Sequence, residues 1–587
     1  MKHKIEDLIR QAINTLIKNG TLDGSVSPAI QISRTKDASH GDFACNVALS
    51  LAKAAGKPPR ELAQAICDAL PEDHELEKTE IAGPGFINFF ISSDTSQNVI
   101  KMVLAQNEDY GRSSIGAGKK IQIEFVSANP TGPLHVGHGR GAAYGASVAS
   151  LMRAVGFDVD CEYYVNDAGR QMNILATSIW LRYLQEHGVE LVFPSNGYKS
   201  DAYIFDIARQ IKADHDGAFV VSAEAVMENI PDDEPAGGDK DKHIDALIER
   251  AQELLGEAGY LTIFNAGLDT ILADIREDLE EFGVPYEYWY SEKTLAQRDL
   301  INTAVEQLQA AGHIYELKGA LWFKSTSFGD EKDRVVIRDN GQATYFASDI
   351  AYHMDKFQRG YERVINIWGA DHHGYVARVK AAINALGEDE SKLDILLVQF
   401  AILYRGSERV PMSTRSGSFV TLRELRKEVG NDAARFFYVM RKCEQHMDFD
   451  LDLAKSQSND NPVYYIQYAH ARVCSVFNQL KEKNLQHDIE NGNNNLTKLT
   501  ESHETELITK LSAYPDVIEK AALQAEPHSL VHYLRELANL FHTYYNAHYF
   551  IVDDIDVRDA RLNLIRATQH VIHNGLGLLG VSSPESM

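Results

Sequence analysis

The chain has 587 residues, which is too long for one hydrophobic core, since a domain typically holds ~150 residues. Hydrophobic residues make up 44% and charged residues 24%, which excludes a disordered, collagen-like or coiled-coil protein. The net charge of −26 counts against nucleic-acid binding, unless Lys and Arg gather on one face to make a basic footprint.

Other sequence features limit the class of protein further. No apolar run approaches the ~20 residues of a membrane helix. The first twenty residues form an amphipathic helical pattern instead of a signal peptide. The five cysteines are scattered and lie at no metal-ligand spacing, which argues against disulfides and structural zinc. We therefore expect a cytoplasmic protein with no metal site of its own and no membrane partner.

Residues 1–112 are predicted to form a small α/β domain. Helical patterns over 5–19, 42–54 and 58–70 precede two extended segments, 80–82 and 86–91, with a Gly-Pro-Gly turn between them. The Gly/Ser-rich stretch 109–118 indicates a domain boundary.

Residues 113–455 are predicted to form an α/β domain with a parallel sheet. A strand over 121–126, a helix over 136–155 and a strand over 157–164 make a βαβ unit. A helical insertion is expected over about 189–283, after which the α/β pattern returns at 320–324, 334–337, 363–367 and 395–403. Residues 456–587 are expected to be entirely helical.

Residues 127–141 are the most informative segment, because they join the first strand of the βαβ unit to its helix. Ligands bind at this carboxyl edge of an open parallel sheet, and the helix N-terminus favours phosphate. His135 and His138 share one face of the first turn, and Gly137 lets a ligand approach the backbone.

Two other interpretations of this segment stay open. Residues 137–142 match the loose dinucleotide pattern G-x-G-x-x-A, but they lie too far from the strand for its tight turn. The two histidines could also simply cap the helix.

Several segments together resemble the arginyl-tRNA synthetases, of bacterial type, within class I of the aminoacyl-tRNA synthetases. Ala128–His138 resembles the "HIGH" signature in the form found in these enzymes. Further segments resemble the family in the same order: His40–Ala44, Gly56–Pro59, Gly83–Asn88, Ala343–His353, Trp368–Gly374, Asp432–Arg435 and Asn461–His470. The resemblance implies an N-terminal tRNA D-loop-binding domain, a Rossmann-type catalytic domain and a helical anticodon-binding domain.

The resemblance also implies an ATP-dependent, AMP-forming arginine–tRNA ligase. Its catalytic residues would be His135, His138 and Arg415, with the histidines donating hydrogen bonds to the α-phosphate as arginine attacks it. The phosphate loop, expected at 411–418, departs from "KMSKS" at both lysines, which are Pro411 and Arg415 here. Arg415 and Arg140 are the candidate cations for the phosphates. The predicted ATP ligands are Asn129, Thr131, His135, Gly137, His138, Arg140, Met412 and Ser413.

The substrate arginine would be recognised by its guanidinium. Tyr345 and Asp349 lie four apart on a predicted helix, so a ring and a carboxylate share one face. The resemblance places Glu124 and Asn129 at the α-amino end, and the complete predicted set is Glu124, Ser127, Asn129, Tyr345, Asp349 and Asp371. Alternatively, Tyr345 is core and Asp349 a surface acid.

For tRNA, the resemblance assigns Phe86 and Asn88 to the D-loop, as an aromatic platform and a base-reading amide. The alternative is a buried Phe beside a turn-capping Asn. The expected partners are tRNA(Arg), L-arginine and ATP with Mg²⁺, and the expected state is a monomer that binds no DNA. Two rival functions remain: a class I synthetase or nucleotidyl transferase of other specificity, and an inactive RNA-binding relative.

Overall fold

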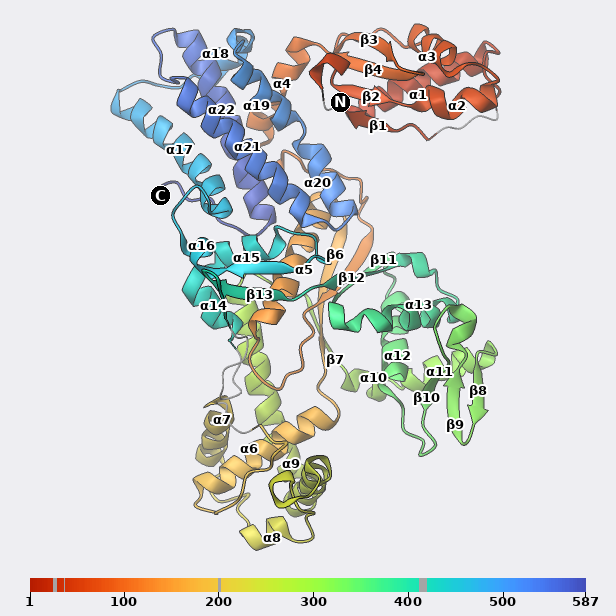
Figure 1. Cartoon of the computed structure of the whole chain (residues 1–587), viewed down its shortest axis with the longest axis vertical. Helices are drawn as coiled ribbons and strands as arrows, with labels where there is room; N and C mark the ends of the chain where they lie inside the picture. Colours follow the sequence, from red (N-terminus) through yellow and green to blue (C-terminus); the bar gives the residue numbers. More distant parts are fainter. Residues whose placement is uncertain (25–28, 36, 199–201, 411–419) are drawn as a thin grey trace. The chain divides into compact units, whose positions relative to one another are not determined.

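A computed structural model describes residues 1–24, 29–35, 37–198, 202–410 and 420–587 (Figure 1). The chain divides into two compact units, each described here by itself. The first comprises 1–110, 475–513 and 539–571, and the second 111–474, 514–538 and 572–587.

The N-terminal part of the first unit is an antiparallel sheet covered by helices. The strands run in the order β1 (Ile32–Arg34), β2 (Phe43–Cys45), β4 (Phe86–Ile91) and β3 (Leu76–Ala82). Ile87 and Phe89 of β4 are fully buried in a core with the helices α1 (Lys2–Lys18), α2 (Val47–Ala55) and α3 (Pro59–Asp68). Strands alternate their side chains, so Phe86 and Asn88 lie on the opposite face of β4. Strands β1 and β2 were not predicted from the sequence.

The rest of the first unit is helical. It contains α4 (Ser93–Gln106), α18 (Ile489–Asn494) and α19 (Ser502–Ser512), with parts of three longer helices: α17 (Pro462–Glu482), α21 (Pro527–Ala547) and α22 (Ile555–Leu578). The helices after residue 456 agree with the all-helical pattern predicted for the end of the chain, whereas α4 was not predicted.

A five-stranded parallel sheet organises the second unit. The order is β12 (Leu393–Val398), β11 (Arg363–Gly369), β5 (Lys120–Phe125), β6 (Asp158–Val165) and β7 (Tyr288–Ser291). Sequence order therefore runs outward in both directions from β5, which makes the gap between β5 and β11 the switch point where such sheets bind ligands. Helix α5 (Val136–Ala154) begins after β5 at this point.

Close packing holds α5 on one face of the sheet, while α12 (Tyr345–Gln358) covers the other face. A side chain at Gly145 would put its Cβ only 2.3 Å from the ring of Phe125, so this position in α5 requires glycine. Glu124, the neighbour of Phe125 on β5, points to the opposite face and pairs with Lys356 of α12.

The later strands differ from the sequence predictions in three ways. The α/β pattern already resumes at β7, before residue 320. The segments predicted at 320–324 and 334–337 form β9 (Ala320–Phe323) and β10 (Arg334–Ile337) of a separate antiparallel sheet with β8 (Ile314–Leu317). Residues 395–403 fall into two strands, because β13 (Ala401–Arg405) leaves the main sheet and joins β14 (Glu408–Arg409) and β15 (Met447–Asp450).

Helices complete the second unit. The insertion contains α7 (Ala202–Asp214), α8 (Ala223–Met227) and the long α9 (Lys240–Glu281), which breaks at Gly256. The remaining helices are α6 (Arg170–Glu186), α10 (Lys293–Gln297), α11 (Leu300–Ala310), α13 (Val376–Ala385), α14 (Leu422–Val429), α15 (Asn431–Val439), α16 (Leu451–Lys455) and α20 (Tyr514–Leu523).

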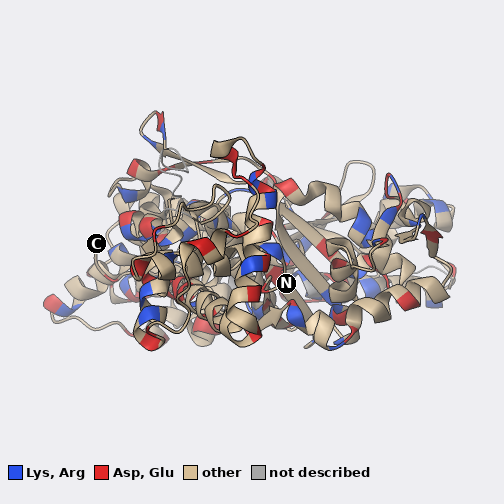
Figure 2. Cartoon of the chain, turned by 90° about the horizontal axis from the view of Figure 1, so that it is seen from below, with Lys and Arg blue, Asp and Glu red and all other residues tan. Residues whose placement is uncertain are grey.

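In the view of Figure 2, basic and acidic residues are interspersed along the ribbon. None of the helices in the described ranges has the length and apolar character needed to cross a membrane. The predicted α/β multidomain fold, with a Rossmann-type parallel sheet and a helical C-terminal part, is confirmed.

Candidate active site at the switch point of the parallel sheet

His135 and His138 both cap the start of α5. The Nδ1 of His135 accepts a hydrogen bond from the backbone N–H of Gly137 at 3.0 Å, and the Nδ1 of His138 accepts from the backbone N–H of His135 at 3.2 Å. A Cβ at Gly137 would approach the His135 ring to 2.7 Å, so glycine leaves room for the capping ring. The interpretation that the two histidines cap the helix is therefore correct.

Capping also determines what else these rings can do. Burial lowers the pKa of His135, and burial with the neighbouring His135 lowers the pKa of His138 to about 3, so both rings are neutral at pH 7. A neutral ring that accepts at Nδ1 carries its proton at Nε2. The rings stack with centroids 3.7 Å apart. Each capping ring therefore carries an Nε2–H donor, so capping and catalysis are compatible.

The turn after β5 is strained. Val126 and Ser127 have positive φ values of 68° and 43°, which are rare for any residue other than glycine and rarer for a β-branched one. The turn brings the Ser127 hydroxyl back onto its own strand, where it donates to Glu124 Oε1 at 3.0 Å and accepts from the backbone N–H of Tyr164 at 3.1 Å. The strained turn therefore fixes the orientation of the Ser127 and Glu124 side chains.

Three carboxylates interact across the carboxyl edge of the sheet. Burial, and then the negative charges of Glu124 and Glu292, raise the pKa of Asp349 to about 7. Burial, and then Asp167, raise the pKa of Glu292 to about 7. Lys356 and Arg378 lower the pKa of Asp349 but offset the acids only in part, so the cluster is suited to a positively charged ligand.

Glu292 was missed in the sequence analysis because β7 was missed. It follows the last residue of β7, and its backbone N–H donates to Val165 O at 3.0 Å, which holds it at the same sheet edge. The signal was the aromatic run Tyr288–Tyr290, which is typical of a strand.

Tyr345 and Asp349 lie in the first turns of α12, as predicted. Thr344 caps this helix, accepting from the backbone N–H of Ala347 at 3.3 Å. The Tyr345 side chain is 61% exposed, so it is not part of the core, and its hydroxyl lies 3.7 Å from the position of a Cβ at Gly169. Asp349 is half-buried and belongs to the carboxylate cluster, so it is not a simple surface acid.

Arg140 does not fit its predicted role as a phosphate ligand. Its side chain is 0% exposed, and its guanidinium donates to the carbonyl oxygens of Gln399, Lys442 and Gln445 at 2.7–2.8 Å. A guanidinium with its N–H groups committed to buried carbonyls serves the packing of the domain. The prediction for Arg140 is therefore wrong.

The other predicted residues are placed as follows. Asn129 is exposed and donates to Gln171 Oε1 at 2.7 Å, and the carbonyl of Thr131 accepts from the Tyr203 hydroxyl at 2.6 Å. Asp371 is exposed, directly after β11 at the carboxyl edge. The predicted residues Met412, Ser413 and Arg415 lie outside the described residues.

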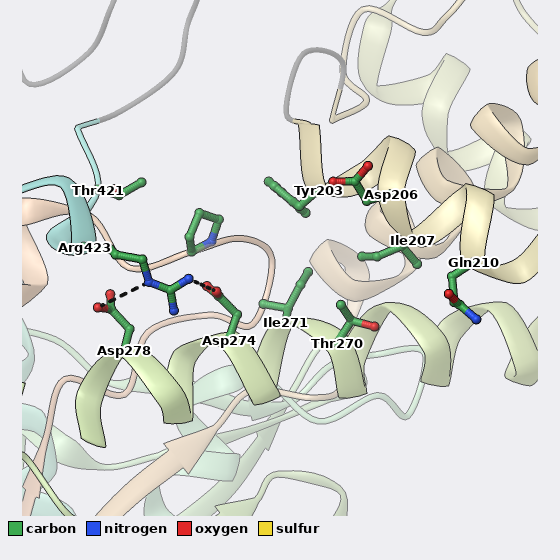
Figure 3. A pocket seen from close by; sticks show the side chains of 11 residues that line it. Tyr203, Asp206, Ile207, Gln210, Thr270, Ile271, Asp274, Asp278, Thr421 and Arg423 are labelled. Carbon is green, nitrogen blue, oxygen red and sulfur yellow. Dashed lines mark ion pairs between the residues drawn. The ribbon is translucent and has the colours of Figure 1, made fainter. Parts of the chain in front are cut away.

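The segment that follows the predicted phosphate loop is attached to the histidine helix. The backbone N–H of Val136 donates to Val420 O at 3.1 Å, and Thr421 makes a β-bridge with His135. Beside it lies a cavity of about 520 Å³, lined by α7, α9, Pro133, Thr421 and Arg423. Figure 3 shows Arg423 between Asp274, at 2.9 Å, and Asp278, at 3.9 Å. These ion pairs tie α14 to the insertion.

Phe86 and Asn88 belong to the first unit. Phe86 is 39% exposed, on the face of β4 away from the hydrophobic core, so the alternative of a buried Phe is wrong. Asn88 is only 4% exposed, lying between Ala44 and Glu80 on the neighbouring strands. Phe86 is thus accessible to a partner.

Comparisons with known proteins agree with this architecture. Family models match as the arginyl tRNA synthetase N-terminal domain at 3–91, the class I (R) tRNA synthetase catalytic domain at 99–231 and 281–453, and the DALR anticodon-binding domain at 466–587. The chain is 64% identical to the arginine–tRNA ligase of Thioalkalivibrio sulfidiphilus and 57% identical to that of Hydrogenovibrio crunogenus, over all of each chain.

A solved structure supports the fold. The arginyl-tRNA synthetase of Thermus thermophilus matches over the whole of both chains with a TM-score of 0.74, at 22% sequence identity. The full-length identity to curated relatives and the three family models in the expected order lead to one conclusion: the chain belongs to the arginyl-tRNA synthetase family.

Proposed function

We propose that this chain is an arginine–tRNA ligase that works at the switch point between β5 and β11. The enzyme activates L-arginine with ATP to arginyl-adenylate and pyrophosphate, then transfers arginine to tRNA(Arg) and releases AMP. The observation that carries the substrate assignment is the coupled cluster of Glu124, Asp349 and Glu292. L-Arginine carries a guanidinium and an α-ammonium, two positive charges that would pair with the carboxylates of this cluster.

The histidines would stabilise the activation step. A carboxylate oxygen of arginine attacks the α-phosphorus, and the bond from that phosphorus to the bridging oxygen of pyrophosphate breaks. Negative charge grows on the α-phosphate oxygens in the transition state. The Nε2–H groups of His135 and His138, with the positive end of the α5 dipole, are the donors suited to it. Because both rings are neutral, they act by hydrogen bonding and not by proton transfer.

The arginine subsite would divide between two ends of the substrate. Asp349 and Glu292 would pair with the guanidinium, and the exposed ring of Tyr345 would stack on it. Glu124, oriented by Ser127, would accept from the α-ammonium. Asn129 and Asp371 complete the proposed set at the same edge.

The triphosphate would extend toward the loop at 411–418. Asn129, Thr131 and Gly137 lie on the strand-to-helix connection, and Met412, Ser413 and Arg415 are proposed from the loop, with Arg415 as the cation for the outer phosphates. ATP would bind with Mg²⁺, which usually keeps several waters and is held by substrate phosphates.

The tRNA would be recognised outside this site. We propose the boundaries 1–112, 113–455 and 456–587, with Phe86 and Asn88 on the D-loop and the helical C-terminal domain on the anticodon. Monomeric state, cytoplasmic location and lack of DNA binding are part of the proposal.

Aminoacylation of unfractionated tRNA, and of tRNA(Arg) by itself, with each of the twenty amino acids tests the assignment. Charging with arginine alone is the expected result. Charging with a different amino acid would favour a synthetase of other specificity, and no charging at all would favour an inactive RNA-binding relative.

A further inference from the structure

A row of polar side chains crosses the centre of the parallel sheet on the face that α12 covers. Asn366 of β11 lies directly opposite Glu124 of β5, and Glu124 lies directly opposite Glu162 of β6. All three are buried, at 6% exposure or less. Buried acids require partners, since an unpaired charge in this environment is very unfavourable.

Helix α12 and its C-cap residue, Arg359, supply one cation for each acid. The Nζ of Lys356, which is 0% exposed, lies 2.5 Å from Glu124 Oε2 and 2.8 Å from Asn366 Oδ1. One turn later Arg359 lies 2.5 Å from Glu162. Both pairs join a buried acid of the sheet to a cation, although Arg359 also pairs with Asp355 and Glu162 also accepts from the Tyr352 hydroxyl. Only the first pair includes a carboxylate of the proposed arginine subsite.

A chain of hydrogen bonds links Lys356 to the backbone of Asp349. The amide of Asn366 donates to Nε2 of His353 at 2.7 Å, and Nδ1 of His353 donates to the backbone carbonyl of Asp349 at 2.7 Å. Burial, and then the positive charge of Lys356, lower the pKa of His353 to about 3. The ring is therefore neutral, and it can accept at one nitrogen and donate at the other.

We propose that Lys356 positions the Glu124 carboxylate for the α-ammonium of arginine, through a buried network whose other members are Asn366 and His353. The inference rests on the proposed function and deepens it. Lys356 does not touch the substrate. Lys356 donates a hydrogen bond to Oε2 of Glu124, and Ser127 donates one to Oε1. Each oxygen keeps a second lone pair that can accept from the substrate.

The same ammonium also acts on the guanidinium end. The groups that face Asp349 are Glu124 on β5, Glu292 after β7, Lys356 on its own helix and Arg378 on α13; the two acids raise its pKa and the two cations lower it. Tyr164 on β6 also faces this carboxylate. Removing Lys356 should therefore raise the pKa of Asp349 further above its native value of about 7.

The test is Lys356→Met in the full-length enzyme, with Arg359→Met as the matched control. Both variants leave a buried acid on the sheet without its cation, so both should lower the melting temperature. Only Lys356→Met should raise the arginine KM, by ~10–100-fold, by analogy with outer-shell partners of metal ligands. The ATP KM should stay near native in both.

The pH dependence of kcat/KM for arginine is a second measurement, which would not change if Lys356 had only a structural role. The pH below which kcat/KM for arginine declines should rise in Lys356→Met and stay near 7 in Arg359→Met. Lys356→Arg, which keeps the charge, should recover most of the arginine affinity.

Unchanged arginine KM in Lys356→Met would overturn the proposal, and so would equal losses of arginine and ATP affinity in both variants. If Lys356→Met does not fold, Asn366→Leu removes the second acceptor of Nζ and keeps the charge. It should still raise the arginine KM, and an unchanged value would refute the network. Failure of the native enzyme to charge tRNA with arginine would instead refute the proposed function.

Discussion

Replacing His138 by alanine separates the two roles that the structure gives this residue. The change removes the Nδ1 that caps the backbone N–H of His135 at 3.2 Å, and it removes the Nε2–H donor. Losing a cap typically costs ~1 kcal/mol of stability. Losing a donor aimed at transition-state charge typically costs ~10²–10³ in rate, or ~2.7–4 kcal/mol.

The two effects are measured by different assays. We expect His138→Ala to show a small drop in melting temperature, a kcat for aminoacylation lower by ~10²–10³, and an arginine KM close to native. Ser222→Ala is the control, because Ser222 caps α8 at 3.3 Å and takes no part in the proposed chemistry. It should lose similar stability and keep the native rate.

Two results would refute this reasoning. A rate that falls no more in His138→Ala than in Ser222→Ala would mean that His138 only caps. A rise in the arginine KM parallel to the loss of rate would mean that the sheet edge itself is disturbed.

Four further predictions follow from the same geometry. Asp349→Ala should raise the arginine KM by more than ~30-fold, from a ~2–5 kcal/mol truncation cost, with little change for ATP; equal effects on both would indicate misfolding. Because arginine binds the ionised Asp349, whose pKa is about 7, kcat/KM for arginine should fall as pH drops below 7, whereas a flat profile from pH 6 to 8 would contradict this. Asn88→Ala and Phe86→Leu should each raise the tRNA KM, because each loses up to ~1–3 kcal/mol of binding free energy to the tRNA. Phe86→Leu should keep the native melting temperature, since Phe86 is 39% exposed. A stable variant with a native tRNA KM would remove that residue from the tRNA surface. Arginine-dependent ATP–pyrophosphate exchange should be negligible until tRNA(Arg) is added, because the loop lacks both signature lysines, and full exchange without tRNA would oppose this.

Local features of the candidate active site were predictable from the sequence. The positions of His135 and His138 at the start of a helix depend on contacts within three residues, so spacing alone was sufficient. The shared face of Tyr345 and Asp349 followed from the helical repeat in the same way. The βαβ unit was predictable because its strands and helix have distinct periodicities.

Which charged side chains lie at the candidate site depends on the tertiary structure. Arg140 stands beside the histidines in sequence, yet carbonyl groups more than 250 residues away take up its guanidinium, because the helix turns that side chain into the domain. Lys356 is distant from Glu124 in sequence, and Glu292 is distant from Asp349. Lys356 reaches Glu124 because α12 crosses the buried face of the sheet, and Glu292 acts on Asp349 because parallel strands end at one edge. Sequence spacing determines neighbours along one helix or strand, whereas the electrostatic environment of a carboxylate depends on every element that packs against it.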